Sequence, residues 1–239
     1  MRLDKYLADT TGLSRRDLKK LIKKGKAEVE GSVIRDPGFG VGEDSHVTLE
    51  GKEQSYRRYV WYMLNKPAGL VSATEDRREK CVLDLFEKEA AKGLFPVGRL
   101  DKDTEGLLLI TNDGRTAHRL LSPRFHVDKV YFARLDKEAS EADCEAFAAG
   151  LQVDDDFRAM PAKLELPDGK ESREVRITIH EGKFHQIKRM FEAVGKEVLY
   201  LKRLSMGPVC LDDSLSPGAY RELTAEELTG LQKAAGLSE

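Results

Sequence analysis

The strongest chemical signal in this sequence is an aspartate that precedes an apolar strand. Asp101 lies in a polar loop, and an uninterrupted apolar run from Leu107 to Ile110 follows it. A carboxylate held just before a buried strand lies near the floor of a cleft. The alternative is an Asx-type turn that only begins the strand.

Two further segments supply an aromatic ring and a cation. Tyr131 lies in the strand-like run 129–135, and Lys188 and Arg189 lie in the first turns of a predicted helix. An acid, a flat ring and a cation from three separate stretches suit an isomerisation on a nucleobase, which needs charge without metal or cofactor. The alternatives are a core tyrosine at 131 and a phosphate contact at 188.

Other common chemistries lack their motifs. The five histidines have no metal-ligand spacing, and neither H-E-x-x-H, G-x-S-x-G nor the G-x-x-x-x-G-K-[ST] phosphate loop occurs. The stretch beginning at Asp101 imitates a calcium loop, but its twelfth position is Asn112 rather than glutamate. We therefore expect no metal and no cofactor.

Composition indicates a globular protein of one large or two modest domains. The chain has 239 residues, of which 40% are hydrophobic and 34% charged, and no apolar run approaches the ~20 residues of a membrane helix. The N-terminus carries charges where a signal peptide would be apolar. Three widely spaced cysteines argue against a disulfide framework. These features favour the cytoplasm and no membrane partner.

The charges are segregated along the chain although the net charge is only −2. Residues 15–26 contain seven basic residues against one acid, residues 182–203 contain six against two, and residues 136–174 contain five against twelve. Local potential governs binding to a polyanion more than the total charge does, so the basic clusters favour a nucleic acid. The alternative is a set of solvated helix faces.

The first fifty residues have the pattern of a small helical and stranded unit. Ser14 resembles a helix N-cap, and Leu18, Leu21 and Ile22 form an apolar stripe opposite a cationic face. Short strands follow around a tight turn at 27–34 and again at 46–49. A polar stretch at 51–58 is interpreted as a linker, which gives a domain of residues 1–55 and a second of residues 56–239.

The second domain has a mixed pattern. Strand-like runs occur at 59–64, 107–111, 129–135, 175–180 and 198–201, and helical patterns occur at 79–92, 115–121, 138–149 and 184–194. This alternation predicts an α+β fold with a mostly antiparallel sheet.

From end to end the chain resembles the RsuA family of pseudouridine synthases, which modify ribosomal RNA. Residues 1–50 resemble the small RNA-binding domain shared with a small-subunit ribosomal protein. The Asn-Lys-Pro-Ala-Gly run at 65–69, the segment 98–114, Lys-Val-Tyr at 129–131 and His-Gln-Ile-Lys-Arg-Met-Phe at 185–191 match in the family's order and spacing. The resemblance implies cleavage of the uracil–ribose bond and reattachment of the base through carbon 5.

The resemblance also implies roles for individual residues. Asp101 matches the family's catalytic aspartate, Tyr131 the tyrosine that stacks on the target base, and Lys188 the basic partner, with the neighbouring Arg189 left open for that last role. Whether the aspartate acts as a nucleophile on the sugar or as a base that removes its 2′ proton is also left open. Asp103 does not match the family's catalytic position and is interpreted as a loop or surface carboxylate. The expected RNA contacts are Arg15, Arg16, Lys19, Lys20, Lys23, Arg99, Arg189 and Arg203, of which the residues at 99 and 203 hold either the RNA backbone or the active-site loop.

The expected partner is ribosomal RNA, specifically 16S RNA or an assembling small subunit, bound by a monomer. The short chain without a long basic tail favours a small-subunit enzyme. The alternatives are a sister enzyme acting on large-subunit (23S) RNA and a non-catalytic RNA-binding protein of ribosome assembly. The latter has no need of Asp101, Tyr131 and Lys188 together.

Overall fold

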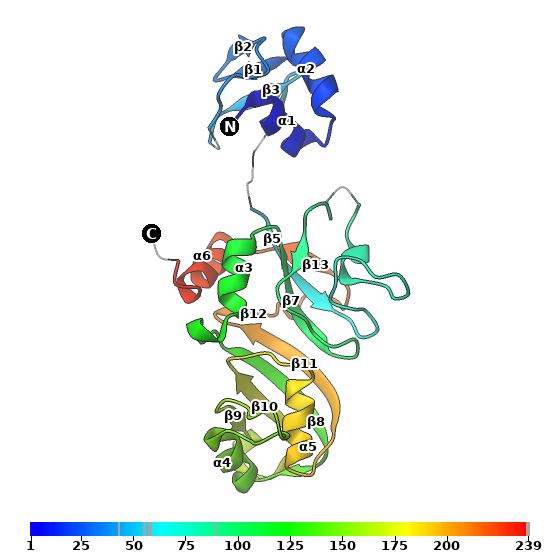
Figure 1. Ribbon diagram of the computed structural model, residues 1–239, viewed down its shortest axis with the longest axis vertical. Helices are drawn as coiled ribbons and strands as arrows, with labels where there is room; N and C mark the ends of the chain where they lie inside the picture. The colour runs from blue at the N-terminus through cyan, green and yellow to red at the C-terminus, as the bar shows by residue number, and fades with distance from the viewer. Residues whose placement is uncertain (43, 55, 57–58, 89, 238–239) are drawn as a thin grey trace. The chain divides into compact units, whose positions relative to one another are not determined.

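The computed structural model describes residues 1–42, 44–54, 56, 59–88 and 90–237, and these form two compact units, Met1–Val60 and Trp61–Glu239 (Figure 1). The domain boundary expected after residue 55 falls among positions 55, 57 and 58, which lie outside the described residues. Within the described part of the chain, none of the helices combines the length and apolar composition needed to cross a bilayer.

The first unit places two helices on a small sheet. Helices α1 (Leu3–Thr11) and α2 (Arg15–Lys23) precede strands β1 (Ala27–Val29), β2 (Ser32–Ile34), β3 (Val47–Leu49) and β4 (Lys52–Gln54), which pair in the antiparallel order β2-β1-β3-β4. The Ser14 side chain accepts a hydrogen bond from the Asp17 backbone and caps α2, as the sequence indicates. Leu18 and Ile22 are fully buried, so the basic residues of α2 face outward.

The second unit is built on one large sheet. Its elements are β5 (Trp61–Lys66), β6 (Phe95–Pro96), β7 (Glu105–Thr111), α3 (Gly114–Leu121), β8 (Lys129–Ala139), α4 (Glu141–Ala149), β9 (Lys163–Glu165), β10 (Ser172–Ile179), α5 (Gln186–Ala193), β11 (Val198–Met206), β12 (Val209–Cys210), β13 (Tyr220–Glu222) and α6 (Ala225–Ala234), with 3-10 turns at Val82–Leu85, Pro123–Phe125 and Pro167–Gly169. The expected α+β class and mostly antiparallel sheet are confirmed.

The strand order explains how distant segments reach one site. Over the described residues the order is β13-β5-β7-β11-β8-β10-β9, and the pairing of β7 with β11 is parallel while the other pairs are antiparallel. Helices α3 and α6 cover the β5–β7 half, and α4 and α5 lie against the half that contains β8 and β10 (Figure 1). The sheet therefore has two halves, which are joined through β7 and β11.

The junction depends on a glycine. Gly106 pairs with Arg203 across β7 and β11, and Arg203 pairs in turn with Tyr131 on β8. Gly106 has φ +96°, and a Cβ at this position would lie 2.3 Å from the Arg203 carbonyl oxygen. No larger residue is tolerated without moving a strand, since both the backbone angle and the space require glycine.

One expected element is absent. The helical pattern at 79–92 is wrong, because the structure has a 3-10 turn at Val82–Leu85 with turns and bends around it, and residue 89 lies outside the described residues. Asp84 accepts a hydrogen bond from the Cys81 backbone at 2.8 Å, and Cys81 bridges to Val71. These local bonds satisfy backbone groups that a helix would otherwise use.

Candidate active site

The loop that carries Asp101 is fixed by a buried lysine. The Lys66 ammonium donates to the carbonyl oxygens of Asp101, Lys102, Thr104 and Pro67 at 2.9–3.3 Å. Burial removes Lys66 from water and lowers its pKa to about 8. One side chain from the end of β5 thus determines the path of the loop before β7.

A second set of bonds holds the residue before the aspartate. The Ser72 hydroxyl donates to the Leu100 carbonyl oxygen at 2.9 Å and accepts from the Leu100 amide at 3.1 Å. The amide of Thr104 donates to the Asp101 carbonyl oxygen at 3.1 Å and closes a turn. Because the backbone is held on both sides, the Asp101 side chain has a defined direction.

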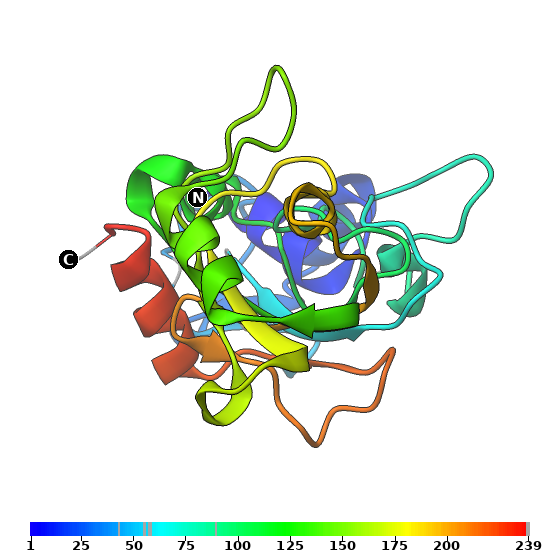
Figure 2. The ribbon, with the colours of Figure 1, turned by 90° about the horizontal axis from the view of Figure 1, so that it is seen from below.

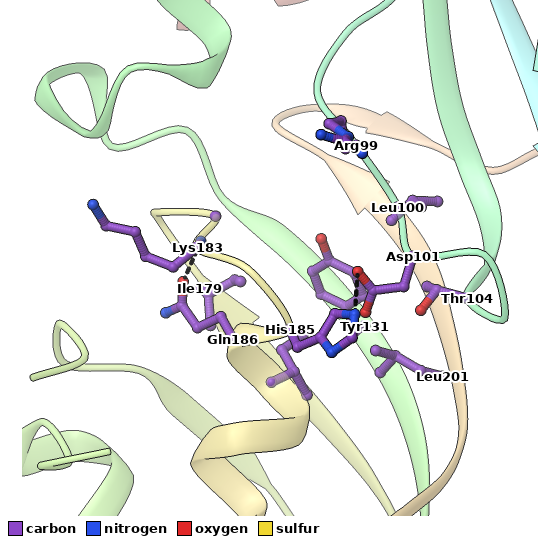
Figure 3. Close-up of a pocket in the computed structure, with 12 residues that line it drawn as sticks. Arg99, Leu100, Asp101, Thr104, Tyr131, Ile179, Lys183, His185, Gln186 and Leu201 are labelled. Carbon is purple, nitrogen blue, oxygen red and sulfur yellow. Dashed lines mark hydrogen bonds and ion pairs between the residues drawn. The ribbon is translucent and has the colours of Figure 1, made fainter. Parts of the chain in front are cut away.

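The Asp101 carboxylate lies in a pocket and close to two nitrogen-bearing side chains. The side chain of Asp101 is 24% exposed; its Oδ2 lies 3.7 Å from Lys188 Nζ and its Oδ1 lies 3.7 Å from His185 Nε2. Tyr131 and Thr104 line the same pocket, and Figure 3 shows the Tyr131 ring beside the carboxylate. The acid, ring and cation expected from three separate segments are therefore brought together.

Lys188 is shared between two carboxylates. Its Nζ lies 2.7 Å from both oxygens of Asp103, which is a closer contact than the one to Asp101. Partial desolvation of Asp103 is the largest single influence and opposes ionisation, but the hydrogen bond and the positive charge of Lys188 together outweigh it, so the pKa of Asp103 lies below its usual value. The surface carboxylate expected at 103 thus has a direct electrostatic contact with the site.

Arg189 is held away from Asp101. Its guanidinium pairs with Asp154, stacks 5.2 Å from the centre of the Phe157 ring and donates to the Phe184 carbonyl oxygen. Of the two neighbouring cations, Lys188 is therefore the one next to the catalytic candidate.

Arg203 does not suit a contact with the RNA backbone, because it is only 2% exposed. Its Nε donates to the Leu107 carbonyl oxygen at 2.7 Å, and its Nη1 lies 3.5 Å from the Tyr131 hydroxyl. Two roles were expected for Arg203, holding the RNA backbone or holding the active-site loop, and its burial argues against the first. Arg203 instead braces the ring and strand β7 from within the sheet.

Comparisons with known proteins agree with the geometry. The family model described as RNA pseudouridylate synthase matches residues 60–193, and the S4 domain model matches residues 1–47. This chain belongs to the RNA pseudouridylate synthase family. It is therefore an isomerase that acts on RNA.

Relatives of this pseudouridine synthase cover almost its whole length. A Bacillus subtilis protein named as an uncharacterised RNA pseudouridine synthase is 47% identical over 95% of this chain and 97% of its own. A ribosomal small subunit pseudouridine synthase A from Pseudomonas aeruginosa is 45% identical over 95% and 99%, and one from Escherichia coli K12 is 39% identical over 97% and 100%. A crystal structure of a pseudouridylate synthase superposes with a TM-score of 0.68 at 35% identity, covering 97% of this chain and 99% of that one.

The S4 domain of this synthase displays the cations expected to contact RNA. Arg15, Arg16, Lys19, Lys20 and Lys23 are all exposed on α2. Buried Asp4 pairs with Arg15 at 2.8 Å and approaches Lys19 at 4.0 Å. Burial raises the pKa of Asp4, but hydrogen bonds from Arg2 and Arg15 outweigh it and the pKa lies below its usual value. An ionised Asp4 therefore orients part of the cationic surface.

Sequence reasoning assigned no role to three residues near the carboxylate. His185 belongs to the motif at 185–191 and Lys66 to the motif at 65–69, but neither motif predicts which atoms these side chains contact. For the contact between Asp103 and Lys188, the only signal in the sequence is that Asp103 lies two residues after Asp101. Arg99, expected to contact RNA, is exposed and lines the pocket at its edge (Figure 3).

Proposed function

We propose that this pseudouridine synthase isomerises a uridine of small-subunit (16S) ribosomal RNA, with Asp101 as its essential carboxylate. The observation that carries the proposal is that Asp101 and Tyr131 line one pocket and that Lys188 Nζ lies 3.7 Å from the Asp101 carboxylate. Residues 1–55 act as the RNA-binding domain and residues 56–239 as the catalytic domain. The protein is proposed to act as a monomer.

The reaction exchanges one bond of the glycoside for another. The bond between sugar carbon 1′ and base nitrogen 1 breaks, a bond from carbon 1′ to carbon 5 forms, carbon 5 loses a proton and nitrogen 1 gains one. Asp101 serves either as the nucleophile at the sugar or as the base that takes the 2′ proton, and both roles need an ionised carboxylate. Lys188 places a positive charge 3.7 Å from this carboxylate.

Tyr131 provides the surface for the extruded base. A uridine must leave its stack to reach Asp101, which costs a few kcal/mol, and stacking on an aromatic ring offsets part of that cost. The bracing of Tyr131 by Arg203 supports this role, because a ring with a fixed orientation loses less entropy on binding.

The choice of the small subunit is supported by relatives of nearly equal length that are named ribosomal small subunit pseudouridine synthase A at 38–45% identity. A large-subunit substrate is the competing assignment. Release of tritium from transcripts labelled at carbon 5 of uracil separates the two, and we expect release from small-subunit RNA alone. Release confined to large-subunit RNA would reverse the assignment.

The role of Asp101 is tested by Asp101→Asn with Asp103→Asn as its matched control. Both variants lose one negative charge from the same loop. We expect Asp101→Asn to abolish tritium release while RNA binding is retained, and Asp103→Asn to remain active. Equal loss in the two variants would show that loop charge, rather than this carboxylate, is what the reaction needs.

A further inference from the structure

An exposed aromatic ring stands directly outside the pocket. The Phe184 side chain is 76% exposed, and its ring stacks on His185 with centroids 3.8 Å apart and planes 16° apart. His185 also lines the pocket that contains Asp101. The two rings thus form a continuous stack that leads from the reacting carboxylate to the solvent.

The backbone is strained where the stack forms. His185 has φ +49°, a left-handed conformation that is uncommon for a residue with a side chain. Successive side chains of an extended strand point to opposite faces, whereas here two consecutive rings lie face to face. Strain of this kind persists where the surroundings impose it, and it concentrates at binding sites.

Phe184 also lines a second depression. It is about 530 Å³ in volume, within the roughly 300–1,000 Å³ typical of ligand pockets. It is lined by Phe157 and Arg189 and by three carboxylates of the segment 154–156. Figure 2 shows the loop that follows α4 projecting beside the segment that leads into α5. Lys183 lines both this depression and the Asp101 pocket, so the two adjoin.

The charges of the depression select its occupant. Three carboxylates outnumber Lys183 and Arg189, and Arg189 is already paired with Asp154, so a phosphate is disfavoured. A neutral nucleobase suits the depression, because its face can stack on Phe184 and an exocyclic amino group can donate to a carboxylate. Extrusion of the uridine also leaves its neighbour without a stacking partner.

We propose that the depression binds the nucleotide next to the target uridine, with its base stacked on Phe184 and with a preference for a base that carries an amino group. The inference rests on the proposed uridine site at Asp101. Phe184 is then a specificity-determining contact that acts on RNA binding and not on the bond exchange.

The direct test is a fluorescence titration of the full chain. The probe is a single-stranded heptanucleotide RNA with a central uridine and 2-aminopurine on one side of it. We expect the native chain and Phe184→Tyr to quench the probe and Phe184→Ala to bind about tenfold more weakly without the quench. Equal quenching in the native and alanine chains, or no change with the native chain, overturns the proposal.

Two controls make the result specific. Leu199→Ala removes another exposed apolar side chain of the same unit, 60% exposed on β11, and should leave quenching and tritium release unchanged. Asp101→Asn should still quench the probe, which distinguishes failure of the stacking contact from failure of the proposed chemistry. An effect of Phe184→Ala seen with assembled ribosomal particles but absent with free RNA would assign the ring to a protein partner and overturn the proposal.

The base preference has its own test. The native chain should bind heptanucleotides with cytidine beside the uridine about tenfold more tightly than those with uridine there, and the double variant Asp155→Asn/Asp156→Asn should lose this difference. An undiminished preference in the double variant would overturn the role of the carboxylates.

Discussion

Lys188 Nζ lies 2.7 Å from both oxygens of Asp103 but 3.7 Å from the nearer oxygen of Asp101. Asp103 is 70% exposed in its side chain, whereas Asp101 is 24% exposed. The shorter contact of Lys188 is therefore with Asp103, the more exposed carboxylate, whose charge water screens more. Asp101 lies slightly farther from the lysine and is less exposed. Asp103 thus holds the Lys188 ammonium, and we propose that Lys188 acts on Asp101 through its charge.

The first prediction concerns Lys188. Lys188→Met should lower the rate of tritium release at saturating RNA by about 10²-fold, because it removes the cation that faces the reacting carboxylate. Asp103→Asn should change the rate by no more than a few fold, since Lys188 remains. Single-turnover measurements check both, and a greater loss in the asparagine variant would contradict the assignment.

The second prediction concerns the stability conferred by Lys66. Lys66→Met leaves the loop carbonyl oxygens of Asp101, Lys102 and Thr104 without their shared donor. We expect the free energy of unfolding at pH 7 to fall by roughly 1–3 kcal/mol and activity to fall with it. Urea denaturation measures the first effect. Unchanged stability with full activity would mean that the loop holds its own shape.

The third prediction concerns pH. The pKa of Lys66 is about 8 in the folded chain and 10.5 when unperturbed. Between these values the unfolded state binds more protons, so the contribution of Lys66 to the free energy of unfolding rises with pH in this window. The difference in stability between the native chain and Lys66→Met should be flat below pH 8 and should increase from about pH 8 to 10.5. A decrease over that range would contradict the burial argument.

The fourth prediction separates exposed from buried cations. Arg16→Ala/Lys23→Ala should flatten the dependence of log K for RNA binding on log salt concentration by about one to two units, because each phosphate contact releases a counterion. Arg203→Met should leave this slope unchanged, since that residue is buried. Filter binding at several salt concentrations gives the slopes. Equal slopes in the three proteins would remove α2 from the RNA interface.

The fifth prediction concerns the two units. Removal of residues 1–55 should lower RNA affinity far more than it lowers the melting temperature of the catalytic unit, because each unit has its own buried core. Calorimetry and RNA titration of the full and shortened chains provide the comparison. Equal affinity would contradict the role of the N-terminal domain in binding.

Much of the fold could be predicted from local pattern. The apolar run at 107–110 lies in β7, and residues 175–179 of the predicted alternating strand lie in β10. Burial on one or both faces of a strand gives the sequence a recognisable pattern of apolar residues. The helix predicted at 79–92 was wrong because Val82, Leu83 and Phe86 are buried within a loop with a 3-10 turn and not on the face of an α-helix. Short-range periodicity does not distinguish these two ways of burying the same side chains.

The site was predictable in its parts and not in its contacts. Motif order pointed to Asp101, Tyr131 and Lys188, and the fold places Asp101 and Tyr131 in one pocket with Lys188 beside the carboxylate. The burial of Arg203 could not be foreseen, because an arginine in a basic stretch resembles a surface cation until the strand register places it between Gly106 and Tyr131. Pairing between strands far apart in sequence carries no local signature.

The parallel contact between β7 and β11 consists of two registered pairs, Glu105 with Lys202 and Gly106 with Arg203. Asp101 belongs to one side of this seam, and Tyr131, His185 and Lys188 belong to the other. The distance between β7 and β11 therefore determines how far Asp101 lies from both Tyr131 and Lys188. We expect a methyl group at residue 106 to push β7 and β11 apart and to abolish activity, although it would touch no reacting atom.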